Sequence, residues 1–494
     1  MHRRVHLCSI ALSQLIISVG ISAPALTAHA QSSSATLELN TVLQSVNDTH
    51  PSLKAAELKQ QAAEYKLTSS RGAFDLQLAA GAEAHPLGGS DKAYGVLDFT
   101  LTQPTTLWGL SLFAGWNASY GYIPAYKDQW YHKVDKNFTG YKGNPEAGPL
   151  GRVHGGIALP ILRDGAIDKN RANVAKAKAK VSYAQASLNK KRLDLQLKAS
   201  DAYWSWLAAG MQVKIATELL ETAAVRQKQI EEKVKQGSDA PIYAVENQKY
   251  LLKRQKNLLK ATQKLQESAI KLSIYWRPDE RARPRVPGDA QLPTSWPSLP
   301  ELPTLEDAQA LSEQIARNRP EWQVFLAELE QANISQNLYQ NQLLPRLDLT
   351  AAAAQPIDTS HKTDMRITLD IASPLQRREA RGAQQAAQAD VIRIQNEQRL
   401  FQDQILATTQ QSIVTLQASA QAVDLAQQEL ELTRTLEEAE RIKLQEGDST
   451  LLVVNLREQA TADAAMSLVD AQKKLHMSYI RYRLNLGTSL LNTP

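Results

Sequence analysis

The longest uninterrupted helical pattern in the chain covers residues 383–446. These sixty-four residues contain no glycine and no proline and are rich in Ala, Gln, Glu and Leu. At about 1.5 Å of rise per residue they would form a helix of roughly 95 Å. Helices of ordinary globular domains are much shorter, so this stretch predicts an elongated and mainly helical protein.

Small and apolar side chains recur along this stretch in alternating steps of three and four. That spacing is typical of a coiled-coil seam and differs from the wider stripe of a core helix. The expected seam residues are Ile413, Leu416, Ala420, Val423, Gln427 and Leu430. Taken alone, the segment is also compatible with a solvated coiled-coil rod.

The first thirty residues have the pattern of a cleaved secretory signal peptide. A basic start at 2–6 precedes an apolar run at 7–21, and small residues at 28 and 30 precede Gln31. The alternative is a retained N-terminal anchor, although polar residues interrupt the short apolar run. The single cysteine, Cys8, lies in this segment, so we expect no disulfide and no thiolate metal site in the mature chain.

Composition argues against several classes of protein. The formal charge is +5, and it falls to +3 once Arg3 and Arg4 leave with the signal, which is too weak to indicate nucleic-acid binding. Nothing after residue 30 resembles a membrane helix, so entry into a membrane would require strands. We find no histidine pair with metal-ligand spacing, no phosphate-binding glycine loop and no nucleophile elbow. We therefore expect neither enzyme activity nor a cofactor.

After the signal, the chain repeats one plan twice. The first repeat, 31–276, is expected to hold a helix at 36–70, strands at about 73–160 and a long helical hairpin at 163–275. A linker at 277–303 contains seven prolines and is expected to be extended and equatorial. The second repeat, 304–494, is expected to hold a helix to about 343, strands at about 345–374 and a second hairpin at 376–486.

The two hairpins align at a constant offset of 210 residues. Arg171 corresponds to Arg381, and Gly237 to Gly447, with no insertion or deletion. Each glycine offers the left-handed position that ends a helix. Two rods of equal length with turns at matching positions predict that both tips end at one level. Charge differs between the hairpins: residues 163–277 carry net +12, and residues 377–483 carry net −2.

Six short segments alternate apolar and polar residues as strands do. They are 74–78, 96–101, 110–113, 156–159, 346–352 and 365–371. Twelve of the twenty-nine aromatic residues lie between Tyr94 and Tyr141. They could form the core of a soluble β-domain, but in an exported chain they fit the aromatic girdles of an outer-membrane barrel. The girdle candidates are Trp108, Trp116, Tyr120, Tyr122 and Trp130.

Several motifs recur in order around the linker. They are Asn47-Asp48-Thr49-His50-Pro51 and Asn318-Arg319-Pro320 early in each half, Leu159-Pro160-Ile161-Leu162 and Ser373-Pro374-Leu375 before the long helices, Ala202-Tyr203-Trp204, and a glycine at each hairpin tip. In this order they make the whole mature chain resemble the TolC-type outer-membrane efflux protein family, also called outer membrane factors.

The resemblance implies a homotrimer in the cell outer membrane. Three chains would close a β-barrel in outer-membrane lipid, and their duplicated hairpins would form a periplasmic α-barrel below it. The implied function is a passive exit duct for drug efflux or type I secretion, working with a periplasmic adaptor (a membrane fusion protein) and an inner-membrane pump of RND or ABC type. Two other classes stay open: a periplasmic coiled-coil protein that never enters the membrane, and a periplasmic hydrolase, which would need an acid–base pair that we do not find.

The resemblance also implies where the functional sites lie. The adaptor would dock at the tips, Gly237, Ser238, Asp239, Ala240, Pro241, Gly447, Asp448, Ser449 and Thr450. The periplasmic aperture would be lined by Asp239, Glu246, Asp448, Asn455 and Arg457 or a subset of them. These residues could equally form plain, solvated helix turns.

Two departures from the family pattern stand out. Where some members carry a ring of aspartates, this chain has Ile242, Tyr243, Val453 and Leu456. The strand region of the first half is also much longer than that of the second, so a simple contribution of four strands per chain is not assumed.

Overall fold

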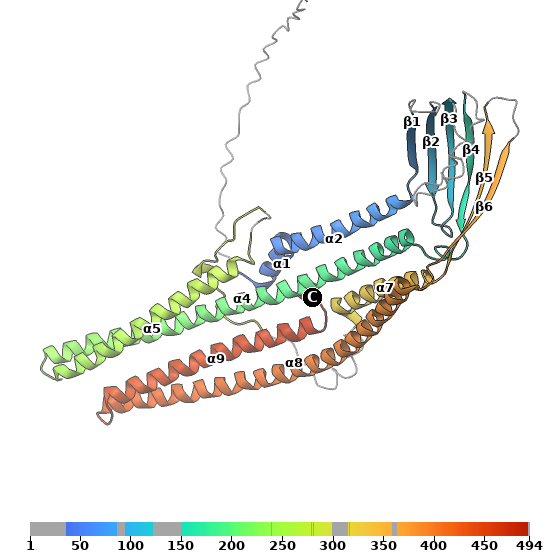
Figure 1. Cartoon of the computed structure of the whole chain (residues 1–494). Coiled ribbons are helices and arrows are strands. Elements are labelled where there is room, and N and C mark those ends of the chain that lie inside the picture. The colour runs from blue at the N-terminus through green and yellow to red at the C-terminus, as the bar shows by residue number, and fades with distance from the viewer. Residues whose placement is uncertain are drawn as a thin grey trace, which may run out of the picture.

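A computed structural model describes residues 36–85, 94–121, 150–238, 240–277, 279, 281–298, 315, 317–357 and 363–492. The described chain is long and bent, with helical rods at one end and a single antiparallel sheet at the other (Figure 1). The predicted fold class, mainly α with a strand-built portion, is confirmed.

The helices form two long hairpins with shorter helices beside them. Helices α4 and α8 contain 67 and 69 residues, and each is therefore about 100 Å long. In each hairpin a shorter helix folds back along the long one. The helices are α1 (Leu39–Thr49), α2 (Pro51–Arg71), α4 (Lys169–Lys235), α5 (Pro241–Ser273), α7 (Pro320–Asn341), α8 (Arg378–Glu446) and α9 (Leu451–Asn485), with short 3-10 turns η1 (Gly72–Phe74), η2 (Asp289–Gln291) and η3 (Leu490–Asn492).

The expectation of one helix over 36–70 was wrong, because the chain breaks at His50. That residue is extended, with φ −72° and ψ 122°, as a residue before proline prefers. Pro51 then begins α2, and the ring nitrogen Nδ1 of His50 accepts a hydrogen bond from the backbone N–H of Ser52 at 3.1 Å. The second half repeats this arrangement, since Arg319 is extended and Pro320 begins α7. Residues 299–314, where the second helix was expected to start, lie outside the described chain.

The coiled-coil seam of α8 is partly different from the predicted one. Gln427 is exposed, and the neighbouring Ala426 is buried in its place. Small hydroxyl residues also lie in the seam, and Ser419 is satisfied there because its hydroxyl donates to the carbonyl oxygen of Thr415 at 2.6 Å. The buried residues of α8 in steps of three and four are Ile405, Thr409, Ser412, Leu416, Ser419, Ala426 and Leu430, with Val423 half-buried in the remaining step.

The main hydrophobic core lies at the waist of the molecule. Tyr203, Trp206 and Leu207 of α4 are buried there against α1, the end of α5 and the C-terminal residues after α9. The linker also packs onto this core. A Cβ atom on Gly210 would lie 2.2 Å from a methyl carbon of Leu292, so the single glycine of α4 makes room for the linker.

One aromatic stack joins three parts of the chain at the waist. The ring of His476 on α9 contacts both Trp204 of α4 and Trp296 of the linker, with centroid distances of 4.4 and 5.2 Å, and the two indole rings contact each other at 5.7 Å. His476 is only 4% exposed. Burial lowers the pKa of His476 from 6.5 to about 4, so the stacked ring is neutral at neutral pH.

The sheet contains six strands in sequence order, and every pairing is antiparallel. Five of the six expected strand segments lie in strands to within one residue, but the first, 74–78, was misplaced, because residues 72–74 form the turn η1 and β1 begins only at Gln77. Four strands come from the first half and two from the second. The pairing of β4 with β5 joins the two halves. The strands are β1 (Gln77–His85), β2 (Tyr94–Pro104), β3 (Ser111–Gly121), β4 (Arg152–Pro160), β5 (Arg346–Pro356) and β6 (Asp364–Ala372).

We predict that His476 makes stability depend on pH. Its folded pKa is depressed, so its contribution is complete above about pH 6.5 and falls as pH decreases toward 4, by at most about 3 kcal/mol. In His476→Phe, which keeps an aromatic ring, unfolding free energy measured by urea titration at pH 7.5 and pH 4.5 should differ less than in the wild type. An identical pH dependence in both proteins would contradict the assignment.

Candidate functional site

The two hairpin tips have the same backbone structure. Gly237 and Gly447 have φ values of +74° and +89°, so both are left-handed, as predicted. The N–H of Ser238 bonds to the carbonyl of Lys233, and the N–H of Asp448 to that of Lys443, each at 2.9 Å. These are the six-residue closures of a Schellman turn, at the predicted offset of 210. Both tips lie at the same end of the molecule, away from the sheet (Figure 1).

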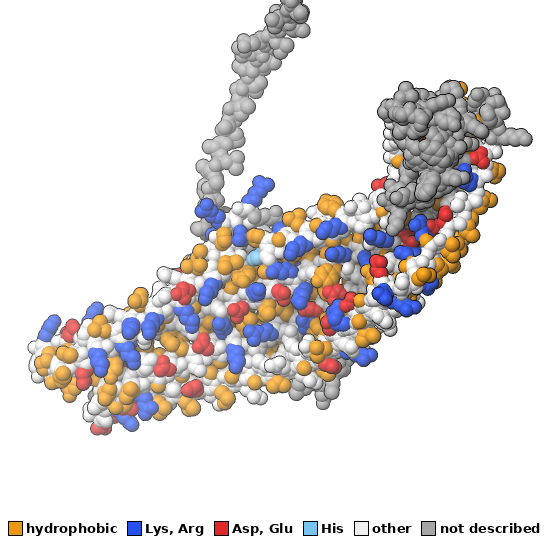
Figure 2. All heavy atoms as spheres, in the orientation of Figure 1, with side chains coloured by type: hydrophobic (Ala, Val, Ile, Leu, Met, Phe, Trp, Pro, Cys, Tyr) orange, Lys and Arg blue, Asp and Glu red, His pale blue; other side chains and the backbone are white. Residues whose placement is uncertain are grey.

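Large apolar side chains are exposed just beyond both turns. Figure 2 shows apolar atoms among charged ones at this end of the molecule. Two of these residues stand at the positions where some members of the resembled family carry aspartates. They are Ile242, which is 57% exposed, and Leu456, which is 58% exposed. Contiguous exposed apolar side chains mark contact surfaces. The tip surface consists of Ile242, Tyr243 and Val245 on α5 and Leu452 and Leu456 on α9.

The predicted aperture residues have different environments. Glu246 and Asp448 are exposed, and the guanidinium of Arg457 lies 3.9 Å from a carboxylate oxygen of Glu440. Asn455 is buried between the hairpins and does not line a surface in a single copy. Asp239 lies outside the described residues. Their role at an aperture stays a prediction.

A buried ion cluster joins the two hairpins near the tips. Glu458 on α9 is 1% exposed and binds arginines from three other helices. Its Oε2 lies 3.0 Å from Nη1 of Arg226 on α4 and 2.8 Å from Nη2 of Arg254 on α5, and its Oε1 lies 3.3 Å from Nη2 of Arg441 on α8. The amide oxygen of Asn455 accepts from Arg226 and Arg254 at 3.0 and 3.2 Å. Because Arg226 lies eleven residues before Gly237 and Glu458 lies eight residues after Thr450, the cluster lies roughly 12–16 Å from the tips.

Glu458 is held in its ionised form. Burial by itself would raise its pKa, but the hydrogen bonds and charges of Arg226 and Arg254 outweigh burial and hold the pKa below its ordinary value of 4.5. Sequence reasoning did not find this cluster. The unequal charges of the hairpins indicated attraction between them, but charge totals do not identify which residues meet.

The sheet has one apolar and one polar face. Leu78, Phe99, Ile157 and Ile367 are exposed on the apolar face. The opposite face carries the buried polar residues Asp98, Thr100, Asn117, Arg152 and His154. On that face Nε of Arg152 donates to Oδ1 of Asn117 at 3.2 Å, and the hydroxyl of Thr100 lies 3.4 Å from Nε2 of His154. In the described part of the chain, no helix has the length and apolar character that a membrane span requires.

The predicted girdle residues are only partly described. Trp108 lies in the turn between β2 and β3, at the end of the sheet nearest the helices, and is exposed. Trp116 lies in the middle of β3, where its indole N–H donates to the carbonyl of Leu150 at 3.1 Å. Tyr120 is on β3, but its side chain, like Tyr122 and Trp130, lies outside the described residues.

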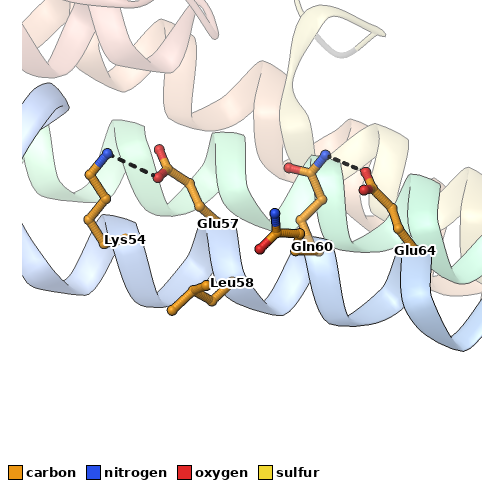
Figure 3. A pocket seen from close by; sticks show the side chains of 6 residues that line it. Lys54, Glu57, Leu58, Gln60 and Glu64 are labelled. Atoms are coloured by element: carbon orange, nitrogen blue, oxygen red, sulfur yellow. Dashed lines mark hydrogen bonds and ion pairs between the residues drawn. The ribbon is translucent and has the colours of Figure 1, made fainter. Parts of the chain in front are cut away.

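Nothing in the described residues indicates a chemical centre. Among them, no three His, Cys, Asp or Glu side chains could hold a metal ion together. Figure 3 shows a hollow along α2, where Lys54 pairs with Glu57 at 3.3 Å and Gln60 donates to Glu64 at 3.2 Å. Pairs at spacings of three and four are those of a solvated helix face.

Residues 157–276 match the family model of the outer membrane efflux protein. Over these residues the chain is similar to that family. The matched region covers the end of β4, from Ile157, and the whole first hairpin, α4 and α5. The resemblance predicted from the sequence motifs is thus confirmed. No curated protein sequence matches the chain.

Solved outer-membrane proteins share the fold. The outer membrane protein VceC of Vibrio cholerae has a TM-score of 0.65 at 16% identity, covering 91% of this chain and 96% of its own. The CmeC outer membrane channel of Campylobacter jejuni has 0.65 at 13%, covering 97% and 95%. The open state of the Neisseria gonorrhoeae MtrE outer membrane channel has 0.65 at 13%, covering 91% and 88%. At these identities the likeness establishes the fold.

We predict that Glu458 stabilises the paired hairpins. Glu458→Ala leaves three guanidinium groups close together without their shared carboxylate, and we expect a loss of about 3 kcal/mol in unfolding free energy. Asp463→Ala, at an exposed position on the same helix, should change stability by less than about 0.5 kcal/mol.

The difference between Glu458→Ala and wild type should also depend on pH. Because the folded pKa of Glu458 lies below 4.5, its contribution is complete above that pH and disappears as pH falls through the folded value. Equal unfolding free energies for the two substitutions at pH 7, measured in urea, would contradict the assigned role.

Proposed function

We propose that the protein is an outer-membrane exit duct of a tripartite efflux or type I secretion machine. One observation carries the proposal: two helical hairpins of matched length end in identical turns at one end of the chain and join a sheet with one apolar face at the other. A sheet of this kind suits lipid, and rods of about 100 Å suit a water-filled periplasm.

The functional unit in this proposal is a homotrimer. In lipid every backbone N–H and C=O must be paired, so an open sheet must close into a barrel. The described residues of one copy supply six strands with edges at β1 and β6, which is fewer than the eight strands of small barrels. Closure therefore requires further copies, and the family resemblance sets their number at three.

The tip surface is the proposed adaptor-docking site. Its exposed apolar residues lie at the free end of the molecule, and Leu456 adjoins the ion cluster in the sequence (Figure 2). A periplasmic adaptor with apolar helical ends would bury them. An inner-membrane pump of RND or ABC type would supply the energy, because the sequence contains no phosphate-binding glycine loop.

We predict that a strain lacking this protein is hypersensitive to several unrelated toxic compounds or fails to secrete one polypeptide. The duct is passive, so its loss blocks export without removing any chemical activity. Compound sensitivity and secretion are measured in the deletion strain and after complementation. Fractionation should place the complementing protein in the outer membrane as a trimer.

The outcome of fractionation separates the two main hypotheses. Recovery as a soluble periplasmic protein would favour the coiled-coil alternative. Unchanged sensitivity and secretion in a strain shown to express the wild-type protein before deletion would count against any export role.

We predict that Gly447→Val weakens export while the trimer still forms. A β-branched residue at φ +89° strains the turn by roughly 1–2 kcal/mol, although the added side chain has open space around it. The matched control is Gly382→Val, since Gly382 lies in α8, also in open space and without a positive φ. Compound sensitivity should rise several-fold for Gly447→Val and not for Gly382→Val. Wild-type export by both would refute the docking assignment.

A further inference from the structure

We infer that the β1–β2 hairpin is part of the membrane wall, so that each copy supplies six strands and three copies form a barrel of eighteen. The inference rests on the proposed outer-membrane trimer and specifies how its wall is built. The alternative is that only β3 to β6 line the membrane and that the extra hairpin of the first half lies outside the barrel.

The hairpin is joined to the rest of the sheet along its whole length. β1 pairs with β2 from Gln77↔Thr102 to His85↔Tyr94, and β2 pairs with β3 from Pro104↔Ser111 to Tyr94↔Gly121. The strands contain nine and eleven residues, the length that a tilted strand needs to cross a bilayer. Because β2 already occupies the edge of β3, that edge is not available to another copy.

The apolar face of the sheet continues across this hairpin without a change of side. Leu78 on β1 pairs with Leu101 on β2, and Leu101 pairs with Ala114 on β3. The next apolar row joins Phe99 to Trp116, and Trp116 to Val153 on β4. Since each pairing places residues on the same side, Leu78, Phe99 and Leu101 share the side of Ile157 and Ile367.

The polar face continues across the hairpin as well. Asp98 pairs with Asn117, and Asn117 pairs with Arg152, so the second strand of the hairpin carries the same inward polar row as β3 and β4. All three side chains are buried. A hairpin lying against the outside of a barrel would not need this shared division into an apolar and a polar side. We therefore assign lipid acyl chains as the environment of Leu97, Phe99 and Leu101, which are all exposed in a single copy.

The two free edges can pair with each other in neighbouring copies. Five antiparallel pairings give β1 and β6 opposite directions. β6 of one copy can thus pair antiparallel with β1 of the next, and a ring of three closes with no change of pattern. Among the described residues, β1 and β6 each pair with one strand only, and their apolar side chains are exposed: Leu78 is 69% exposed and Ile367 is 77% exposed. Figure 2 shows the apolar side chains at the outer rim of the sheet.

The number of strands sets the width of the exit. Barrel diameter grows roughly in proportion to strand number, so six strands per copy give a wall about one and a half times as wide as four would. Walls of sixteen to eighteen strands surround an aqueous channel in porins. A barrel of this width suits the passage of bulky molecules, whereas a narrower barrel would admit only small ones.

Cysteine cross-linking between copies tests the inference. The single natural cysteine, Cys8, lies in the predicted signal segment, so the mature protein provides a cysteine-free background. Leu78→Cys on β1 is combined in turn with Met365→Cys, Ile367→Cys, Leu369→Cys and Ile371→Cys on β6, to sample the register. Within one copy these edges are five strand spacings, about 24 Å, apart, so any disulfide must join two copies. We expect covalent dimers and trimers from outer-membrane fractions for at least one pair.

The matched control places the first cysteine on β3. Leu112→Cys with the same four β6 cysteines should give no cross-linked species. Cross-links from Leu112 but not from Leu78 would overturn the inference and leave the trimeric duct intact. Recovery of the protein outside the membrane as a monomer would instead overturn the proposed function.

A second measurement does not depend on finding the register. In purified protein reconstituted into lipid vesicles without an adaptor, Leu97→Cys on β2 should react with a water-soluble maleimide at least tenfold more slowly than Ile242→Cys at the tip. Both side chains are exposed in a single copy, so lipid alone accounts for the difference. Equal reaction rates would overturn the inference.

Discussion

A helix of about 100 Å depends on having a neighbour along its entire length, because no single core can support it. Helix α4 meets this requirement with a succession of partners. It packs against α2 and α7 near the sheet, against α1 at the waist, and against α5 and α9 toward the tip. Buried alanines such as Ala209, Ala216 and Ala223 follow one another at seven-residue spacing and allow the helix axes to approach closely. At the waist, the hydrophobic core adds aromatic and aliphatic side chains from both ends of the chain.

The two halves share one order of helices and strands but differ in charge and in strand number. The basic first hairpin supplies Arg226 and Arg254, and the second supplies Glu458, so the difference in charge becomes a direct contact between unlike hairpins. At the other end the halves differ in strand number, with four against two. The two halves are therefore most alike in the helices, where equal lengths bring both hairpin tips to the same level. They differ most in the sheet, where an additional hairpin can be added to a free strand edge.

The features that could be predicted from the sequence are those fixed by local chemistry. A long run without glycine or proline predicts a rod, and Gly237 and Gly447 supply the left-handed residue that ends each one. The features that could not be predicted depend on distant partners. Ser419 is buried against α9, where its hydroxyl lies 3.2 Å from that of Ser478, and Gly210 is required because Leu292, far along the chain, packs against it. Nothing local distinguishes Glu458 from the many exposed glutamates of the rods, since three separate helices bring its arginines.

Strand pairing across the duplication has a mechanical consequence. β4 and β5 are paired from Arg152↔Pro356 to Pro160↔Asp348. The hydrophobic core at the waist also joins the two halves, because it contains residues of both. The part from the sheet to the waist is thereby held together at two places, and the hairpins beyond the waist extend from it. From Gly210 to Gly237 this extension is about 40 Å long, so a tilt of about 10° displaces the tip by about 7 Å. A modest rotation at the waist would thus displace the tips by several ångströms, with the sheet left unchanged.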